Sequence, residues 1–178
     1  MKDEVNDLVQ RLDGMTFNHS THVREIARNY EKNVMGDIDK SLSTAAFLHD
    51  VGKVYIPFCI IDKPSSLTKL ERQVIDLHPY LGYQMLKEFE VDEEICRTVL
   101  YHHSFNPPVL EDIGTYRNSK IDEMAVMLKT IDIYEALITA RPYRRGFSKK
   151  KALKILESES ENKLLSADIL KFLNEYDE

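Results

Sequence analysis

The apolar residues of this chain recur mainly at intervals of three and four positions, which is the period of an amphipathic helix. Glycine and proline interrupt the pattern where helices are expected to end. No stretch of useful length alternates between apolar and polar residues, so no β-strand is predicted. The pattern predicts helices over residues 5–12 and 23–30, from Leu42 into His49, from Thr68 to near His78, from Pro79 onward, from Asp92 to His102, from about Lys120 to Ala140, and after Ser148 and Ser166.

Polar residues at an expected helix start support this interpretation. Thr68 and Glu71 have the spacing of a capping box, in which each side chain bonds the backbone at the other position. Residues 104–119 contain two prolines and are expected to form an irregular loop. The sequence shows no internal repeat, low-complexity segment or interdomain linker. We therefore expect residues 1–178 to form a single all-α domain, a compact helical bundle.

Composition and charge limit the classes of function. Apolar residues make up 43% of the chain and charged residues 30%, as in ordinary soluble proteins. No stretch approaches the roughly 18 apolar residues of a membrane span, and the N-terminal MKDEVNDLVQ lacks the apolar core of a signal peptide. We expect a cytoplasmic protein that does not bind membranes. The net charge of −6 argues against binding a nucleic-acid polymer, but is compatible with a small anionic substrate in a locally positive cleft.

The two cysteines, Cys59 and Cys96, show no CxxC spacing and no disulfide framework. We interpret them as two small buried residues in a reducing compartment.

The positions of the histidines are the most informative feature. Five of the six histidines, one followed by an aspartate, are expected at helix ends: His19 at the start of one helix, His78 at the end of another, and His49-Asp50 and His102-His103 at the ends of two more. Imidazole and carboxylate groups at helix ends can converge on one point, and this mixed nitrogen and oxygen set suits first-row metals. A single histidine is more often a core or surface residue, however, and spacing alone leaves both interpretations open.

The segment AAFLHDVGKVYIP at residues 45–57 strongly resembles the signature of HD-domain phosphohydrolases, and of the HD-GYP subfamily in particular. The resemblance continues in order along nearly the whole chain. The further matching segments are HSTHV at 19–23, IDKPSSLTKLE at 61–71, HPYLGYQML at 78–86, YHHS at 101–104, TIDIYEALITARPYRR at 130–145 and SADILKFL at 166–173.

The resemblance implies a site for two divalent metal ions between helix ends of an all-α HD-domain bundle. One ion would be held by His19, His49, Asp50 and Asp132, and the other by His78, His102 and His103, with Asp50 bridging the two. Iron or manganese is expected, with nickel, zinc or magnesium as alternatives, because histidine and aspartate ligands accept several metals.

The resemblance also implies residues that contact the substrate. Lys53 matches the lysine that binds the substrate phosphate beside the metals, and Asp50 and Lys53 are the expected catalytic residues. Arg141 and Arg144 match basic residues that hold the phosphates of the substrate; for Arg144, an exposed helix start is an equally good interpretation.

Four departures from the family pattern affect this prediction. Where the subfamily has His-His-Glu-Arg followed by Asp-Gly and Gly-Tyr-Pro, this chain has HHSFNPPVLEDIGTYRN, so the GYP loop is missing. Met15 stands where some members have a glutamate that supports a third metal, which favours two ions. Glu135 replaces an aspartate, and its role is left open. His22 replaces an arginine and is expected on the helix surface, with metal binding as the alternative.

The expected function is metal-dependent hydrolysis of a cyclic dinucleotide, with cyclic di-GMP as the first candidate. Two metal ions would lower the pKa of a bridging water, and the resulting hydroxide would attack phosphorus. Alternatives are an HD-domain hydrolase of another nucleotide or phosphoester, and a non-catalytic module that binds nucleotide or a partner. The expected partners are a small nucleotide substrate and a sensory or signalling protein.

Overall fold

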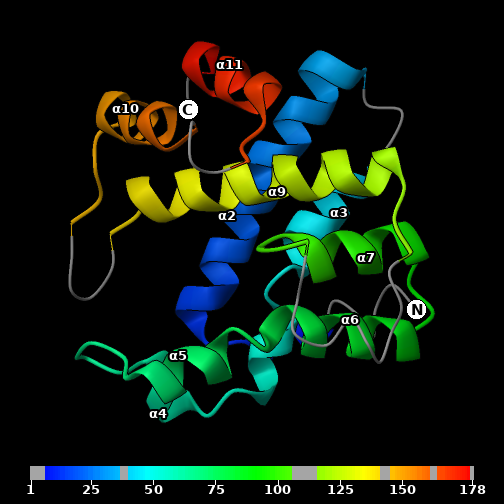
Figure 1. The fold of residues 1–178 in the computed structure, drawn as a ribbon, viewed down its shortest axis with the longest axis vertical. Helices are drawn as coiled ribbons and strands as arrows, with labels where there is room; N and C mark the ends of the chain where they lie inside the picture. The colour runs from blue at the N-terminus through cyan, green and yellow to red at the C-terminus, as the bar shows by residue number, and fades with distance from the viewer. Residues whose placement is uncertain (1–6, 37–39, 106–115, 141–144, 161–163, 177–178) are drawn as a thin grey trace.

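The computed structural model describes residues 7–36, 40–105, 116–140, 145–160 and 164–176, and within these ranges the chain forms helices and no strand (Figure 1). The all-α prediction is therefore confirmed. In chain order the helices are α2 (Gly14–Tyr30), the π-helical η1 (Glu31–Met35), α3 (Ser41–Leu48), the 3-10 helix η2 (Val51–Tyr55), α4 (Phe58–Ile61), α5 (Lys69–Ile75), α6 (His78–Glu88), α7 (Glu93–Tyr101), α9 (Ser119–Ile138), α10 (Lys149–Ser160) and α11 (Ala167–Glu175).

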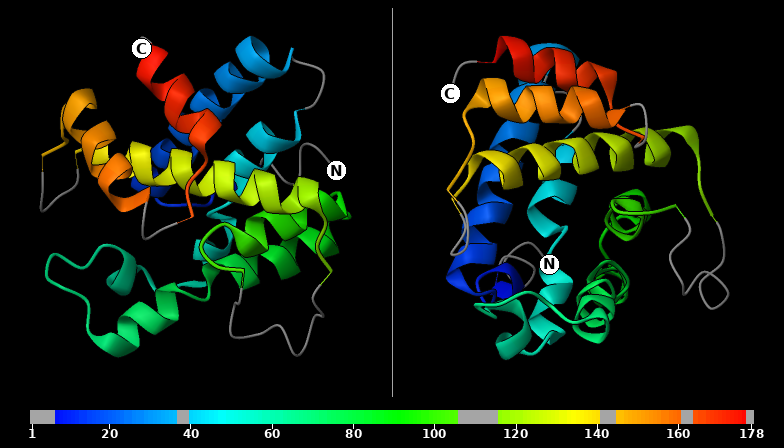
Figure 2. Two further views of the ribbon diagram at one scale, coloured as in Figure 1. Left: turned by 45° about the horizontal axis from the view of Figure 1, so that its top comes forward. Right: turned by 60° about the vertical axis from the view of Figure 1, so that its left-hand side comes forward.

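Helix α9 is the centre of the arrangement. It packs against α2, α3 and α7 and also against α10 and α11. Figures 1 and 2 show α10 and α11 on one side of α9, with α3 and α7 on the other and α6 beyond α7. Ile121, Leu128 and Ile131 of α9 are fully buried. A helix that is covered on several sides needs apolar residues around most of its circumference, and the sequence of α9 provides them.

Helix α2 begins earlier than the sequence suggested. The side chain of Asp13 accepts hydrogen bonds from the backbone of Met15 and Thr16, so it caps a helix that starts at Gly14. His19 therefore lies in the second turn of α2, and the expectation that it opens a helix is wrong. Its backbone is fixed by the helix on both sides.

His78 also lies in a different place from the one expected. Helix α5 ends at Ile75, and α6 begins at His78 with Pro79 in its first turn. Proline is tolerated there because the first backbone N–H groups of a helix have no partner within the helix. His78 thus opens α6 and does not close α5.

The other helix boundaries follow the sequence signals. The predicted capping box of α5 is present, with Glu71 N bonded to the side chain of Thr68 and Thr68 N to the side chain of Glu71. Ser166 caps α11 by accepting a hydrogen bond from Ile169 N. Helix η1 ends at Gly36, whose φ of +82° is readily adopted by glycine.

Gly52 allows η2 to approach α6 closely. A Cβ atom at this position would lie 2.1 Å from the carbonyl oxygen of His78 and 2.5 Å from the backbone nitrogen of Gly82. A side chain larger than hydrogen cannot be accommodated without moving one of the two backbones. Because Gly52 is two residues after Asp50, this contact brings Asp50 next to His78.

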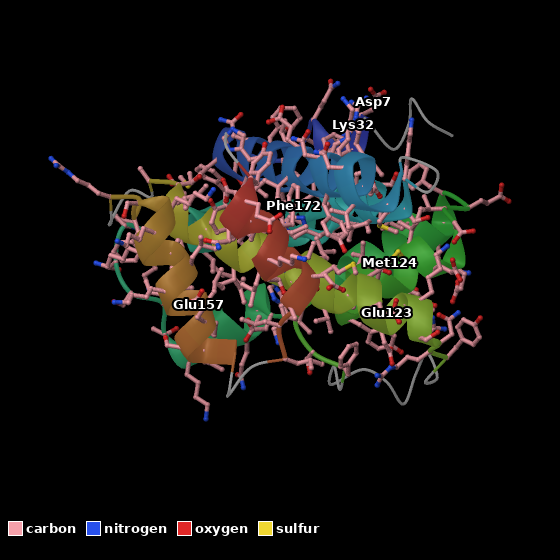
Figure 3. All side chains as sticks on the ribbon, turned by 90° about the horizontal axis from the view of Figure 1, so that it is seen from above. Asp7, Lys32, Glu123, Met124, Glu157 and Phe172 are labelled. Atoms are coloured by element: carbon pink, nitrogen blue, oxygen red, sulfur yellow. The ribbon has the colours of Figure 1, made fainter. Side chains whose placement is uncertain are left out.

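The core and surface divide as the apolar pattern indicates. The charged residues labelled in Figure 3, Asp7, Lys32, Glu123 and Glu157, are exposed. Phe172 is buried, with its ring centroid 5.4 Å from that of Tyr30. Within the described ranges, no helix is both long enough and apolar enough to cross a bilayer.

The two cysteines differ from each other. Cys96 is buried, as expected, and desolvation raises the pKa of its thiol to about 12. Cys59 is exposed on the short helix α4, so the expectation that it is buried is wrong. Helix α4 has no buried residue, which agrees with the exposure of Cys59.

Candidate metal centre

The seven predicted ligands converge from five segments of the chain. They are His19 in α2, His49 and Asp50 after α3, His78 at the start of α6, His102 and His103 after α7, and Asp132 in α9. Three overlapping groups have ligand atoms within 4.8 Å of one another: His78, His102 and His103; His19, His49 and Asp132; and His49, Asp50 and His102.

The five imidazole rings form a continuous series. The ring centroids of His19 and His49 are 5.2 Å apart, and those of His49 and His102 are 5.3 Å apart. His78 continues the series, at 5.4 Å from His102 and 5.1 Å from His103. The histidines of the two predicted metal-ion sites therefore lie side by side around one centre.

Three of these histidines have the same hydrogen bond, which fixes which ring nitrogen is free. Nδ1 donates to the carbonyl oxygen three residues earlier, from His49 to Ala46 at 2.7 Å, from His78 to Ile75 at 2.7 Å, and from His102 to Val99 at 2.6 Å. Each Nε2 is then an acceptor. All three Nε2 atoms are buried and have no hydrogen-bond partner among the described residues.

Buried polar atoms without a partner are rare in proteins, because they lose their hydration and gain nothing in return. Metal ions in the two predicted sites would satisfy these Nε2 lone pairs, and an Nδ1–H bond to a carbonyl is the usual support of a metal-binding histidine. Burial lowers the pKa of His49, of His78 to about 3, and of His102 well below its ordinary value. These imidazoles are neutral at physiological pH, as metal binding requires.

Asp50 faces both groups of histidines. Its Oδ1 is 3.2 Å from Nε2 of His78, whereas its Oδ2 is 3.4 Å from Nε2 of His49 and 3.9 Å from Nε2 of His19. Lys53 Nζ donates to Oδ2 at 2.7 Å. Burial favours the neutral carboxyl, but His49, Lys53 and His78 outweigh it and hold the pKa of Asp50 well below its usual range. The geometry could place one carboxylate between two metal ions.

His19 and Asp132 complete one side of the centre. Nε2 of His19 is 2.9 Å from Oδ1 of Asp132. Burial alone would lower the pKa of His19, but hydrogen bonds to Asp132 and Glu135 raise it to about 9. The same contact helps to hold the pKa of Asp132 below its usual range despite burial.

Glu135, whose role the sequence left open, is part of this arrangement. It lies one helical turn after Asp132 on α9, is fully buried, and accepts a hydrogen bond from Nδ1 of His19. The i, i+3 spacing of Asp132 and Glu135 could have indicated that both face the same neighbour. His22 is half exposed, and its Nδ1 is 3.2 Å from Oε1 of Glu135. It is in none of the three ligand groups.

A cavity of about 1170 Å³ opens onto the centre. The predicted site residues that line one part of it are His19, Asp50, Lys53, His78, His103 and Asp132. His49 and His102 are almost completely buried. Residues of α5 and the following turn line another part, including Leu70, Val74 and Leu77. The predicted phosphate-binding residues Arg141 and Arg144, and residues 106–115 of the altered loop, lie outside the described residues.

Comparisons with known proteins identify related sequences. The sequence is 34% identical over 119 residues to a 3'3'-cGAMP-specific phosphodiesterase 3 of Vibrio cholerae, covering 65% of this chain and 25% of that protein. It is 28% identical over 145 residues to a cyclic di-GMP phosphodiesterase of Pseudomonas aeruginosa, covering 80% of this chain and 35% of that protein. The chain thus spans between a quarter and about a third of the length of these two relatives.

The fold has a solved counterpart. The HD domain of the L. monocytogenes phosphodiesterase PgpH, determined in complex with cyclic-di-AMP, superposes with a TM-score of 0.67 over 95% of this chain and 92% of that one, at 17% identity. At this identity the similarity establishes the fold alone. The profile of the HD domain family matches residues 1–167. The chain therefore belongs to the HD-domain family, as an HD-GYP-like member.

Proposed function

We propose that this chain is a metal-dependent phosphodiesterase that hydrolyses a cyclic dinucleotide, with cyclic di-GMP as the first candidate. The observation that supports it best is the convergence of three buried, unpartnered Nε2 atoms on Asp50, whose two oxygens face different groups of histidines. The proposed ligands are the seven predicted ones: His19, His49, Asp50, His78, His102, His103 and Asp132.

The donor set indicates which metals fit and what they would contribute. Histidine nitrogen and aspartate oxygen suit iron or manganese, and also accept nickel, zinc or magnesium. When bound, a pair of such ions lowers the pKa of a water molecule and neutralises the charge that develops on the phosphoryl oxygens. Seven ligands divided around a shared Asp50 are compatible with two ions.

Lys53 provides a fixed positive charge beside the centre. Its Nζ is held by Asp50 at the wall of the cavity, and its side chain is 23% exposed. From there the ammonium group can donate to a phosphate oxygen and stabilise negative charge as the transition state forms. The contribution of Arg141 and Arg144 stays a prediction from the resemblance.

The cavity suits a ligand with an anionic part and a flat apolar part. The His/Asp centre and Lys53 lie at one part of the wall, and Leu70, Val74 and Leu77 of the α5 region lie at another. Leu70 is 74% and Leu77 38% exposed, and Val74 is partly exposed, so these apolar side chains are accessible to a ligand. Phosphates at the centre would place a base near this face. Relatives named as cyclic di-GMP and cGAMP phosphodiesterases support this class of substrate.

The test is hydrolysis by metal-loaded protein of cyclic di-GMP, cGAMP and cyclic di-AMP, with a simple aryl phosphodiester as a substrate that lacks bases. We expect turnover of at least one cyclic dinucleotide, and loss of turnover in Asp50→Ala with helical circular dichroism retained. Turnover of the aryl ester alone would indicate a different phosphoester substrate. Nucleotide binding without turnover would indicate a binding module. Unchanged turnover in Asp50→Ala would contradict the proposed site.

A further inference from the structure

Glu135 connects the candidate metal centre to a second cavity of about 510 Å³, which is lined by residues of α2 and α9 among others. Its carboxylate has one oxygen on each side. Oε2 accepts from Nδ1 of His19, whereas Oε1 accepts from Nδ1 of His22 at 3.2 Å and from Oγ1 of Thr139 at 2.6 Å. His22, Glu135 and Thr139 all line the second cavity. One buried carboxylate therefore links a proposed metal ligand with a half-exposed histidine.

We propose that His22 and Glu135 act as one unit that positions His19 for metal binding. This inference rests on the proposed function, because it assumes that His19 binds a metal ion. A carboxylate that accepts from Nδ1–H fixes the tautomer and orientation of the imidazole and leaves Nε2 for the metal. His22 and Thr139 in turn fix the carboxylate, since both donate to its other oxygen.

A side chain fixes the orientation of the His19 ring, whereas backbone carbonyls fix the rings of three other histidines of the centre. His49, His78 and His102 each donate to a backbone carbonyl, whose position is set by its own helix. His19 donates to a glutamate side chain, which has several rotatable bonds and must itself be held in place. The orientation of His19 is therefore sensitive to substitutions that leave the helices unchanged.

The two members of the unit are also two of the departures from the family pattern. In the family pattern that this sequence resembles, position 22 is an arginine and position 135 an aspartate, whereas this chain has the shorter histidine and the longer glutamate. The structure shows that these two side chains touch. The longer glutamate side chain still reaches the shorter histidine side chain, so the two departures from the family pattern compensate for each other. The side chain of His22 is 52% exposed and lines the second cavity, which leaves room for an arginine.

The test measures Mn²⁺ binding to the metal-free full chain by isothermal titration, with circular dichroism of each variant. Glu135→Ala is expected to weaken Mn²⁺ binding about 10- to 100-fold on the His19 side. Glu135→Asp is expected to weaken it as well, because the shortened carboxylate cannot reach His19 and His22 together. The exchange His22→Arg with Glu135→Asp is expected to restore affinity to within about threefold of the wild type, so that the two substitutions are not additive.

Glu31→Gln is the matched control. Glu31 is another fully buried glutamate, but its Oε1 accepts from Ser43 N, at the start of α3. Its replacement is expected to leave Mn²⁺ affinity unchanged. If Glu135→Ala fails to fold, the Glu135→Asp variant and the exchange variant still make the comparison, because both keep a carboxylate.

Three outcomes of the Mn²⁺ titration would contradict the proposal, each in a different part. Wild-type binding that Glu135→Ala leaves unchanged would overturn the positioning unit and leave the metal centre intact. An exchange variant that binds as weakly as Glu135→Asp would show that His22 and Glu135 act independently. Absence of Mn²⁺ binding to the wild type itself would overturn the proposed function, and the positioning unit with it.

Discussion

At the scale of residues, the chemistry of the site depends on which atoms are left without partners. The Nε2 atoms of His49, His78 and His102 are available because backbone carbonyls occupy Nδ1. The pKa of Asp50 is held well below its usual range despite burial, and Lys53 Nζ donates to its Oδ2. Lys53 is the group in this set whose contribution can be tested without removing a proposed ligand.

Lys53→Met should lower kcat/KM for the cyclic dinucleotide about 10²- to 10³-fold while the metal content is retained. Methionine keeps the length of the side chain but removes the ammonium group, and one charge-stabilising donor has an effect of this size in other enzymes. Steady-state kinetics with elemental analysis of the same sample measures both quantities. Unchanged kinetics in this variant would remove Lys53 from the catalytic residues.

The cysteines provide a prediction that is independent of metal. Only Cys59 should react rapidly with an aromatic disulfide reagent at pH 8 in the native protein, because the thiolate is the reactive form and the pKa of Cys96 is raised to about 12 by burial. Cys59→Ser should abolish the rapid reaction, and urea should expose Cys96. Rapid reaction of both thiols in the native state would show that the region around α7 is more open than described.

At the scale of elements, the site depends on the approach of η2 to α6. Gly52→Ala should destabilise the protein by about 1–3 kcal/mol and weaken metal binding, because the added methyl group would lie 2.1 Å from the carbonyl oxygen of His78. Gly14→Ala is the matched control, since a Cβ there meets nothing within 4 Å. Urea unfolding of the two variants measures the difference. Equal stability would mean that the backbones of η2 and α6 separate readily.

The order of the helices was predictable from the sequence because periodicity, caps and prolines are local signals. The capping box at Thr68 is an example, and it was found as predicted. The placement of His19 and His78 was not predicted correctly. Helix starts are set by a few capping hydrogen bonds, such as the two that Asp13 accepts, and by tolerance of proline in the first turn. The predicted position of a residue in a helix interior is less affected by an error in the helix boundary.

The convergence of the proposed ligands was predictable only through the resemblance to HD-domain proteins. From spacing along the chain alone, the histidines could be either metal ligands or structural residues. The contact between His22 and Glu135 joins residues 113 positions apart, and no local signal indicates it. Such contacts depend on how α2 packs against α9, which the apolar pattern does not specify.

At the scale of the whole molecule, a buried cluster of neutral histidines should make the metal-free protein sensitive to acid. The pKa of His78 is lowered to about 3, and those of His49 and His102 are also lowered. Between the unfolded value of about 6.5 and the folded values, the unfolded chain binds more protons than the folded chain, so stability falls as pH falls. The raised pKa of His19 adds no slope in this range, because its contribution is already complete below about 6.5.

The free energy of unfolding of the metal-free protein should therefore decrease by at least about 1.4 kcal/mol per pH unit well below pH 6.5. Urea unfolding at several values between about pH 7.5 and 4.5 measures this slope. Saturating Mn²⁺ at pH 7.5 should raise the unfolding midpoint, because the ion binds the folded state. A stability that stays flat down to pH 4.5 would mean that the histidines are protonated in the folded protein without cost.

Metal content is the most direct test of the central claim that this HD-domain chain holds a metal centre. Protein purified without chelator should contain about two divalent ions per chain by elemental analysis. Asp50→Ala, which removes the carboxylate shared by both groups of histidines, should contain far less while its helical circular dichroism is unchanged. Wild-type protein that contains no metal, even after reconstitution with Mn²⁺ or Fe²⁺, would contradict the claim.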